Sequence, residues 1–370
     1  MRYIVGTLVG VLLAALILMI VEGVNAVAHW SRPSYSLTRK LASFIGLDFS
    51  SGETVKFPYR AVLTTDGELV GLLPELKKIN AGIGNSPYSA LRTDESAMNT
   101  KKDGCLVQKP NLDKTMTYLR STLFNPLDPP NLFFDTNAQL SPALQAFVDK
   151  YAVRKIRHRT DAAGHRLTFP DVQSDEHVLI AGDSTAVSAM VNDEETVASS
   201  LQKLDPARRY INLGIAGAAA SDVICALEDE LKSGGGKVAE LIYFYCENDF
   251  DKDDKFGTPA AVVERVKALT GEKQIPKVTI IYMPYIYNVV PQFTRFDGSR
   301  GELFPTNVEE RADLKKRSEE AGFRYLDYGE IALAEGDAVQ NQFSTLGMYT
   351  DVAHASPAGI QHIVARLRQN

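Results

Sequence analysis

Cysteine, tryptophan and excess positive charge are all scarce in this chain. Its 370 residues include three cysteines and one tryptophan, and 46 acidic against 40 basic residues give a net charge of −6. Nucleic-acid-binding surfaces normally carry a basic patch. The sequence has neither a basic stripe nor a Cys/His cluster of the zinc-binding type, so we expect no nucleic-acid partner and no metal site.

The three cysteines, Cys105, Cys225 and Cys246, are too few for the disulfide framework of a small secreted domain. We expect buried free thiols, with a single disulfide bond as the alternative. Cys246 lies in an apolar, strand-like segment, where burial raises a thiol pKa. We therefore do not expect it to act as a nucleophile.

A long hydrophobic run lies at the N-terminus. Residues 3–21, YIVGTLVGVLLAALILMIV, carry no charge and would span about 28 Å as a helix, enough to cross a bilayer. We predict an uncleaved single-pass membrane anchor within residues 1–28. A cleaved signal peptide is the alternative, because Ala26-Val27-Ala28 resembles a small-residue cleavage site.

The orientation of this segment is less clear, because basic residues lie on both sides of it. Arg2 precedes it, and Arg32, Arg39 and Lys40 follow it, so the positive-inside rule does not decide. An N-terminal apolar segment normally directs the following chain across the membrane. We therefore expect the globular part on the extracytoplasmic (periplasmic) side, with cytoplasmic exposure as the alternative.

Beyond this segment, the sequence changes character near position 170. Residues 29 to about 150 are rich in Pro, Asn and Ser, and these turn signals predict an irregular extension, which we assign to residues 29–160. From His177 onward, short apolar runs alternate with amphipathic helical stretches. This alternation predicts an α/β domain with a mostly parallel sheet over residues 161–370. The predicted strands are 177–183, 210–217, 241–249, 278–285 and 323–329, and the predicted helices are 221–232, 260–269, 308–321 and 357–367.

Polar or small residues follow the first three predicted strands. Ser184 follows the first strand, the glycines of residues 214–217 end the second, and Asn248 ends the third. In open α/β sheets, ligands bind outside the carboxyl ends of the strands. Taken singly, each residue also has an ordinary structural explanation: Ser184 as a helix N-cap, Gly217 as a turn glycine and Asn248 as a loop or capping residue.

Asp351 and His354 lie just before the helix start formed by Ser356 and Pro357. A histidine at that place is usually structural or exposed. However, serine is a poor nucleophile at neutral pH, and an imidazole oriented by a carboxylate can take its proton. The pair therefore also matches the aspartate and histidine of a catalytic triad.

Together these pieces resemble the SGNH family of GDSL-type hydrolases, which is named for a serine, glycine, asparagine and histidine in four separate blocks. The resemblance covers roughly residues 160–370 and implies a flavodoxin-like three-layer α/β sandwich with a mostly parallel sheet. The chain departs from the family at the third block, where Cys246 and Glu247 precede the asparagine instead of a small residue. The four blocks are AGDSTAVSAMVNDEETVASSLQ (181–202), NLGIAGAAASD (212–222), CENDF (246–250) and DVAHASPAG (351–359).

The resemblance implies that Ser184 is the nucleophile, His354 the general base and then acid, and Asp351 the residue that orients the imidazole. It also implies an oxyanion hole made by the backbone N–H groups of Ser184 and Gly217 and the side-chain amide of Asn248. We expect hydrolysis of an ester without cofactor or metal, with O-acetyl groups of a cell-surface glycan as the substrate class. Two alternatives stay open: an acyltransferase that uses the same triad, and a membrane-tethered binding or assembly component with a hydrolase-like fold.

Overall fold

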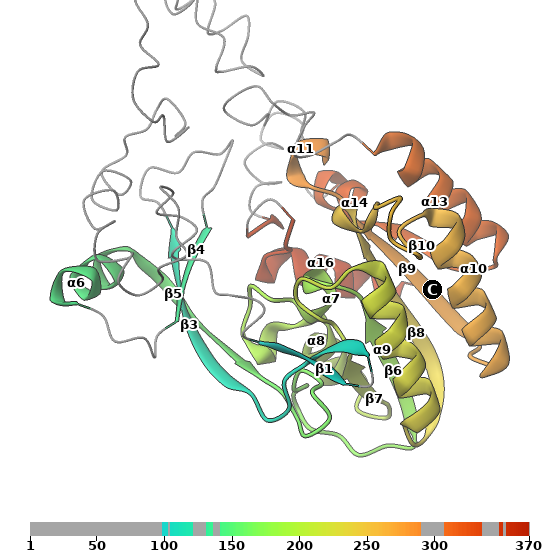
Figure 1. Cartoon of the computed structure of the whole chain (residues 1–370), viewed down its shortest axis with the longest axis horizontal. Helices are drawn as coiled ribbons and strands as arrows, with labels where there is room; N and C mark the ends of the chain where they lie inside the picture. Colours follow the sequence, from blue (N-terminus) through green and yellow to red (C-terminus); the bar gives the residue numbers. More distant parts are fainter. Residues whose placement is uncertain are drawn as a thin grey trace, which may run out of the picture.

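The computed structural model of the chain describes residues 98–102, 104–120, 131–135, 141–289, 307–334, 348–350 and 353–369. These residues form a central sheet covered by helices, with smaller strands packed beside it (Figure 1). The apolar segment 3–21 and Asp351 lie outside the described residues.

A five-stranded parallel sheet forms the centre of the molecule, in the strand order β10-β9-β8-β6-β7 (Figure 1). Read from the β7 edge and numbered along the domain, this is the order 2-1-3-4-5 of flavodoxin-like sheets. The predicted mostly parallel α/β sheet is confirmed. The strands are β6 (Glu176–Ala181), β7 (Arg209–Asn212), β8 (Lys237–Cys246), β9 (Lys277–Met283) and β10 (Arg324–Asp327).

Helices cover both faces of this sheet and make three layers. Successive residues of β6 serve opposite faces: Val178 and Ile180 pack into one core, and Leu179 and Ala181 into the other. Because both faces are buried, the strands read as continuous apolar runs without polar alternation. The first core is closed by α8 (Val197–Leu204), α14 (Tyr328–Ala334) and α16 (Pro357–Arg368), and the second by α9 (Ala220–Ser233), α10 (Pro259–Glu272) and α13 (Val308–Glu320).

The four predicted helices of this domain correspond to α9, α10, α13 and α16, within a few residues at each end. Helices α8 and α14 were not predicted. They have eight and seven residues, and helices this short depend on tertiary packing for their stability. Their apolar faces are buried against the sheet, where Leu201 of α8 and Ile331 of α14 join the same core.

The described part of the extension is not irregular, and this expectation was wrong there. It contains two small antiparallel sheets, β1-β2 and β4-β3-β5. Strand β5 reads AVRKIRHR, and because it is rich in charged residues, the search for apolar runs did not predict it. It pairs with β3, although helix α6 lies between the two strands in the sequence. The elements of the extension are β1 (Asn99–Lys102), β2 (Cys105–Gln108), β3 (Asp113–Arg120), β4 (Asn131–Asp135), α6 (Pro142–Tyr151) and β5 (Ala152–Arg159). In the α/β domain, a single turn, α11 (Ile286–Val289), follows β9.

Two of the three cysteines are paired, which corrects the expectation of free thiols. Cys105 in β2 forms a disulfide bond with Cys225 in α9, across 120 residues of sequence. The pairing depends on the β1-β2 hairpin lying against α9, a long-range contact that the spacing of cysteines does not reveal. Cys246 is a buried free thiol, as predicted.

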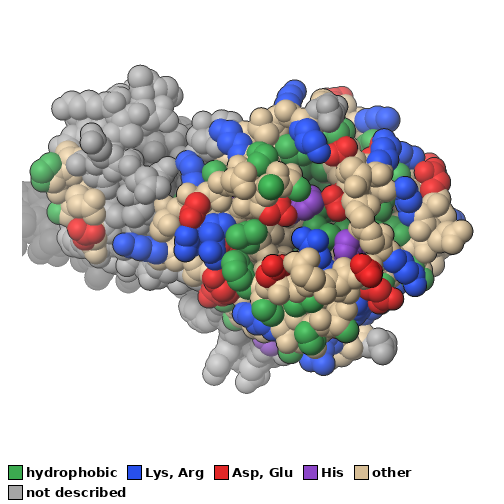
Figure 2. Space-filling model, turned by 90° about the horizontal axis from the view of Figure 1, so that it is seen from below, with side chains coloured by type: hydrophobic (Ala, Val, Ile, Leu, Met, Phe, Trp, Pro, Cys, Tyr) green, Lys and Arg blue, Asp and Glu red, His purple; other side chains and the backbone are tan. Residues whose placement is uncertain are grey.

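Among the described residues, no helix combines the length and the apolar character needed to cross a bilayer. The membrane anchor predicted from residues 3–21 lies outside them and stays a prediction. On the face of the molecule that Figure 2 shows, Lys and Arg side chains are interspersed with Asp and Glu.

Candidate active site

Three loops meet at the carboxyl ends of the adjacent strands β7, β6 and β8. Each loop carries one of the residues predicted for the site: Gly217, Ser184 and Asn248, respectively. Backbone hydrogen bonds tie the first two loops together, from Leu213 N–H to the Ile180 carbonyl at 2.8 Å and from Ile215 N–H to the Gly182 carbonyl at 3.0 Å. The parallel sheet therefore gathers at one edge three residues that are 31 to 64 positions apart in the sequence.

Ser184 is the first residue of a single helical turn, α7 (Ser184–Val187), that follows β6 directly. The residue that caps this turn is Asp183, whose Oδ1 accepts hydrogen bonds from Thr185 N–H at 2.8 Å and Thr185 Oγ1 at 2.7 Å. The alternative interpretation of Ser184 as the N-cap is thus wrong, and the Ser184 hydroxyl donates a long hydrogen bond to Asp183 Oδ2 at 3.5 Å. Gly182 makes the tight strand-to-helix turn possible, because a Cβ atom there would lie 2.8 Å from Phe244.

His354 lies beside this serine. Its Nε2 is 2.8 Å from Ser184 Oγ, although 170 residues separate the two in sequence. This distance is suitable for proton transfer between a hydroxyl and an imidazole. Asp351, predicted to orient the imidazole, lies outside the described residues.

The chain around His354 is held by the start of α16. Thr350 N–H donates to the His354 carbonyl at 2.8 Å. Two residues on, Ser356 Oγ accepts from Gly359 N–H at 3.1 Å, and Pro357 occupies the first turn. The predicted helix start is confirmed, with Ser356 as the cap.

Of the residues predicted to supply oxyanion-hole donors, Gly217 and Asn248 are exposed and Ser184 is buried. Ser184 N–H lies at the start of α7, Gly217 has a φ of +71° in an exposed turn, and Asn248 is exposed in the short 3-10 turn Glu247–Asp249. Within the described part of the chain, no hydrogen-bond acceptor is found for the N–H of Ser184 or Gly217 or for the Asn248 amide. These groups can therefore receive an oxygen from outside the protein.

Glu247, the main departure from the family pattern, turns away from the neighbouring asparagine. It is buried, and its carboxylate accepts from Tyr285 N–H at 2.6 Å and from Asn288 Nδ2 at 2.5 Å. Burial raises the pKa of Glu247, and these hydrogen bonds oppose the shift. The side chain thus anchors the segment after β9 to the loop that carries Asn248.

The neighbouring Cys246 and Asp249 are buried as well. Asp249 Oδ2 accepts from Cys246 N–H at 2.8 Å. Burial raises the pKa of Asp249 well above its ordinary value, and the negative charge of Asp183 adds to the shift. Burial likewise raises the pKa of the Cys246 thiol, so this sulfur is a poor rival to Ser184 as a nucleophile.

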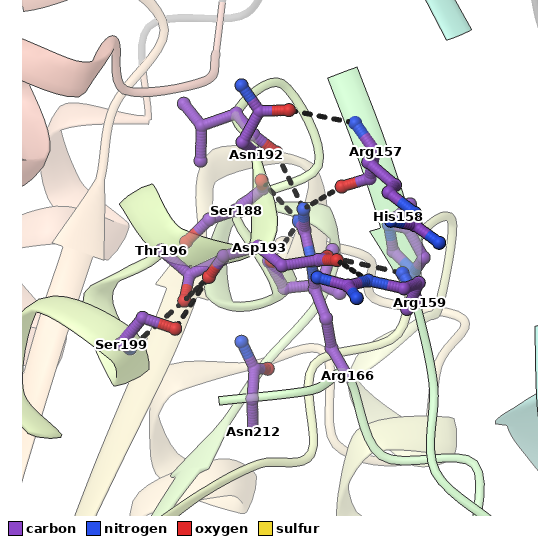
Figure 3. Close-up of polar contacts among 12 residues, drawn as sticks. Arg157, His158, Arg159, Arg166, Ser188, Asn192, Asp193, Thr196, Ser199 and Asn212 are labelled. Carbon is purple, nitrogen blue, oxygen red and sulfur yellow. Dashed lines mark hydrogen bonds and ion pairs between the residues drawn. The ribbon is translucent and has the colours of Figure 1, made fainter. Parts of the chain in front are cut away.

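Arg166, which the sequence did not single out, is buried, and Figure 3 shows its side chain among Ser188 and Asp193. Its Nη1 donates to the carbonyls of Val187 at 2.7 Å and Ser188 at 2.6 Å, and its Nη2 donates to the Val191 carbonyl at 2.6 Å. A four-residue turn has little stability of its own. A cation at its carbonyl end both satisfies these oxygens and favours the helix dipole.

The charge of Arg166 is balanced by Asp193, at a distance of 3.1 Å. Burial lowers the pKa of Arg166, and the carboxylate opposes the shift. Asp193 also accepts from Arg159 of β5 at 2.8 Å (Figure 3). Strand β5 is therefore connected, through Arg159 and Asp193, to the segment that follows the nucleophile.

No protein-family model matches the chain, and no curated protein matches it. Solved structures do match. A lipolytic protein of the G-D-S-L family from Veillonella parvula DSM 2008 matches at 12% identity and a TM-score of 0.39, over 52% of this chain and 95% of that one. A putative G-D-S-L lipolytic protein from Desulfitobacterium hafniense DCB-2 matches at 17% identity and a TM-score of 0.37, over 52% and 98%. A mutant of Axe2, an acetyl-xylooligosaccharide esterase from Geobacillus Stearmophilus, matches at 16% identity and a TM-score of 0.37, over 53% and 94%.

Proposed function

We propose that this protein is a serine hydrolase that cleaves an ester, with Ser184 as nucleophile and His354 as general base and acid. The observation that carries the proposal is the 2.8 Å contact between His354 Nε2 and Ser184 Oγ. The serine lies at the carboxyl end of a central strand, next to donors without acceptors among the described residues. Free serine does not attack esters at neutral pH, whereas a serine that can pass its proton to an imidazole does.

In the first half of the reaction, Ser184 Oγ attacks the ester carbonyl and its proton passes to His354 Nε2. The negative charge that develops on the carbonyl oxygen is stabilised by the N–H groups of Ser184 and Gly217 and the amide of Asn248. Each donor of this kind typically contributes about 3 kcal/mol to lowering the barrier. The C–O bond to the alcohol then breaks, and the leaving oxygen takes the proton from His354.

In the second half, water attacks the acyl group on Ser184. His354 removes a proton from the water and returns it to Ser184 Oγ as the bond to the acyl group breaks. The products are a carboxylic acid and the free enzyme. We assign to Asp351 the task of holding the imidazole in the tautomer whose Nε2 can accept a proton.

The proposed substrate class is an O-acetyl group on a cell-surface glycan. Gly217 and Asn248 are exposed at the site, which suits a small acyl group presented on a large, hydrated molecule. Asn248 and the two backbone donors recognise the carbonyl oxygen, which every ester provides. The proposal needs no cofactor and no metal.

We further propose that the globular part lies on the extracytoplasmic side, attached through residues 3–21. The disulfide bond between Cys105 and Cys225 supports this location, because such bonds persist in oxidising compartments. A reporter fused after Asn370 tests it. Alkaline phosphatase is expected to be active in the fusion, and a fusion in which only a cytoplasmic reporter functions overturns the location.

The activity is tested with a short-chain aryl ester and the Ser184→Ala variant. Alanine cannot form the acyl intermediate, so hydrolysis should fall to the uncatalysed rate while the melting temperature stays close to that of the wild type. Ser188→Ala is the matched control, because Ser188 is also buried and ends the same turn. Activity in Ser184→Ala within a factor of two of wild type refutes the proposal.

A further inference from the structure

The β1-β2 hairpin of the extension lies against the loop that carries Gly217. Two side-chain amides from the hairpin donate to backbone carbonyls of that loop: Asn99 Nδ2 to Ala216 at 2.6 Å and Gln108 Nε2 to Gly214 at 2.7 Å. Asn99 and Gln108 are cross-strand partners in the hairpin. Their side-by-side amides therefore match the spacing of two alternate carbonyls along the loop.

The Asn99 hydrogen bond acts on the peptide group that contains the Gly217 N–H. A peptide group is planar and trans, so its C=O and N–H point in opposite directions. Fixing the Ala216 carbonyl toward Asn99 therefore fixes the Gly217 N–H in the opposite direction, away from the hairpin. Hydrogen bonding at the carbonyl also polarises the group and strengthens its N–H as a donor.

The loop itself would not hold this peptide in one orientation. Residues 215–218 form a β-turn, in which Ala218 N–H donates to the Ile215 carbonyl at 3.2 Å. The φ of +71° at Gly217, the third residue, is that of a type II turn. Glycine also permits the negative φ of a type I turn, and the two turn types differ by a flip of the central Ala216–Gly217 peptide. In the structure, the turn is of type II, and Asn99 binds the carbonyl of this central peptide.

The second amide of the pair connects the same loop to the nucleophile. The Gly214 carbonyl accepts from Gln108, and the N–H of the same peptide group, that of Ile215, donates to the Gly182 carbonyl at 3.0 Å. His158 Nε2 lies 2.5 Å from Gln108 Oε1. Because Gln108 Oε1 can only accept, His158 Nε2 is the donor of this hydrogen bond, and Gln108 Nε2 is left to face the loop. Burial lowers the pKa of His158 well below its ordinary value.

Stability alone does not explain an asparagine at position 99. Its side chain is buried, and its Oδ1 has no hydrogen-bond partner among the described residues. Burying an amide with one end unpaired costs free energy, which an apolar residue of similar size would avoid. The other end supplies the donor for Ala216, and a half-satisfied buried group of this kind calls for a functional explanation.

We propose that Asn99 is a positioning residue of the active site: it holds the Ala216–Gly217 peptide so that the Gly217 N–H points at the carbonyl oxygen of the substrate. The extension thereby completes the oxyanion hole of the α/β domain, and the disulfide bond between Cys105 and Cys225 keeps the hairpin in place. This inference rests on the proposed esterase function. It adds to that function a residue outside the four family-like blocks.

The test compares Asn99→Leu and Asn99→Asp with wild type in hydrolysis of a short-chain aryl ester. Both variants remove the donor, so a folding failure of one leaves the other informative. Removing an oxyanion-hole donor outright lowers kcat by about 10²–10³. For a misdirected donor we expect kcat to fall about 10- to 100-fold, with KM within twofold. Binding of butylboronic acid, whose serine adduct places an oxygen in the hole, should weaken by a similar factor.

Gln202→Leu is the matched control. Gln202 is also a buried amide that donates to a backbone carbonyl, that of Arg208 at 2.8 Å, on the loop between α8 and β7. Its loss should lower the melting temperature without changing kcat or boronate binding more than about twofold. The positioning role is overturned if both Asn99 variants keep kcat and boronate affinity within twofold of wild type. It is also overturned if their losses follow the melting temperature as in Gln202→Leu. A wild-type protein that neither hydrolyses the ester nor binds the boronate instead overturns the proposed function, and this inference with it.

Discussion

The guanidinium of Arg166 and the carboxylate of Asp193 form an ion pair in which Nε and Oδ1 are 3.1 Å apart and both side chains are fully buried. The same guanidinium holds three carbonyls of the segment that follows Ser184. A buried charge is tolerated when each of its hydrogen-bonding groups has a partner. The position of the nucleophile therefore depends on Arg166, a residue outside the four family-like blocks.

Arg166→Leu should destabilise the protein strongly. The substitution leaves Asp193 and the carbonyls of Val187 and Ser188 short of a buried donor, which typically costs about 3–5 kcal/mol. Chemical denaturation measures the change in the free energy of unfolding. Arg157→Leu is the control, because its ion pair with Asp113 is exposed on both sides, and it should change the free energy of unfolding little. A change in the free energy of unfolding as small for Arg166→Leu as for Arg157→Leu would show that the buried network is dispensable.

His165 should make stability depend on pH. Burial lowers its pKa, but hydrogen bonds and charges from Asp161 and Glu230 outweigh burial and raise the pKa to about 9. Because the folded pKa exceeds the unfolded value of 6.5, the contribution is full below about pH 6.5 and is lost as the pH rises through 9. The carboxyl pKa of Glu230 is lowered from 4.5, so its share is lost again as the pH falls below that value.

The measurement is the free energy of unfolding of wild type and His165→Gln against pH. We expect the variant to be less stable by on the order of 2 kcal/mol near pH 6, after allowance for screening at the partly exposed carboxylates. The difference should shrink above pH 9. A difference that stays constant from pH 6 to pH 10 would mean that His165 carries no charge-dependent role.

Asp351 and Ser356 should separate catalysis from helix capping. Asp351→Asn should lower turnover by orders of magnitude, because an amide can favour the wrong imidazole tautomer, while the melting temperature changes little. Ser356→Ala removes the cap on Gly359 N–H and should cost about 1 kcal/mol of stability with little effect on turnover. The reverse pattern would make Asp351 a structural residue.

The disulfide bond should support both stability and catalysis. It closes a long stretch of chain, with a sequence separation of 120 between Cys105 and Cys225, and the double Cys→Ala variant should lose about 2–5 kcal/mol of stability. Because the bond fixes the hairpin that carries Asn99, kcat should fall as well. Cys246→Ala is the control for loss of a buried sulfur. An unchanged melting temperature in the double variant, with the bond confirmed in wild type, would contradict this account.

Much of the α/β domain was predictable because its strands are continuous apolar runs with helical stretches between them. Residues 241–249, for example, contain the buried end of β8 and the turn with Asn248. The pairing of Ser184 with His354 was also expected, from the order of the four blocks. These features are local in sequence, or follow the order of the four blocks.

The supports of the site could not be predicted in the same way. Arg166, Asn99 and Gln108 act on backbone carbonyls that lie 21 to 117 residues away in sequence. Every residue has a backbone carbonyl, so no residue type in the sequence indicates which carbonyl these side chains bind. Likewise, β5 is rich in charge because its arginines bind Asp113, Asp193 and Glu194, and this pairing exists only in the folded chain.

The central claim, an activated serine at position 184, is tested most directly by labelling with a fluorophosphonate and mapping the adduct by mass spectrometry. The account predicts one adduct per chain, on Ser184, with labelling absent in Ser184→Ala and greatly slowed in His354→Gln, while Ser188→Ala labels as wild type. A folded wild-type protein that takes up no probe, or that carries the adduct on another residue, would contradict it.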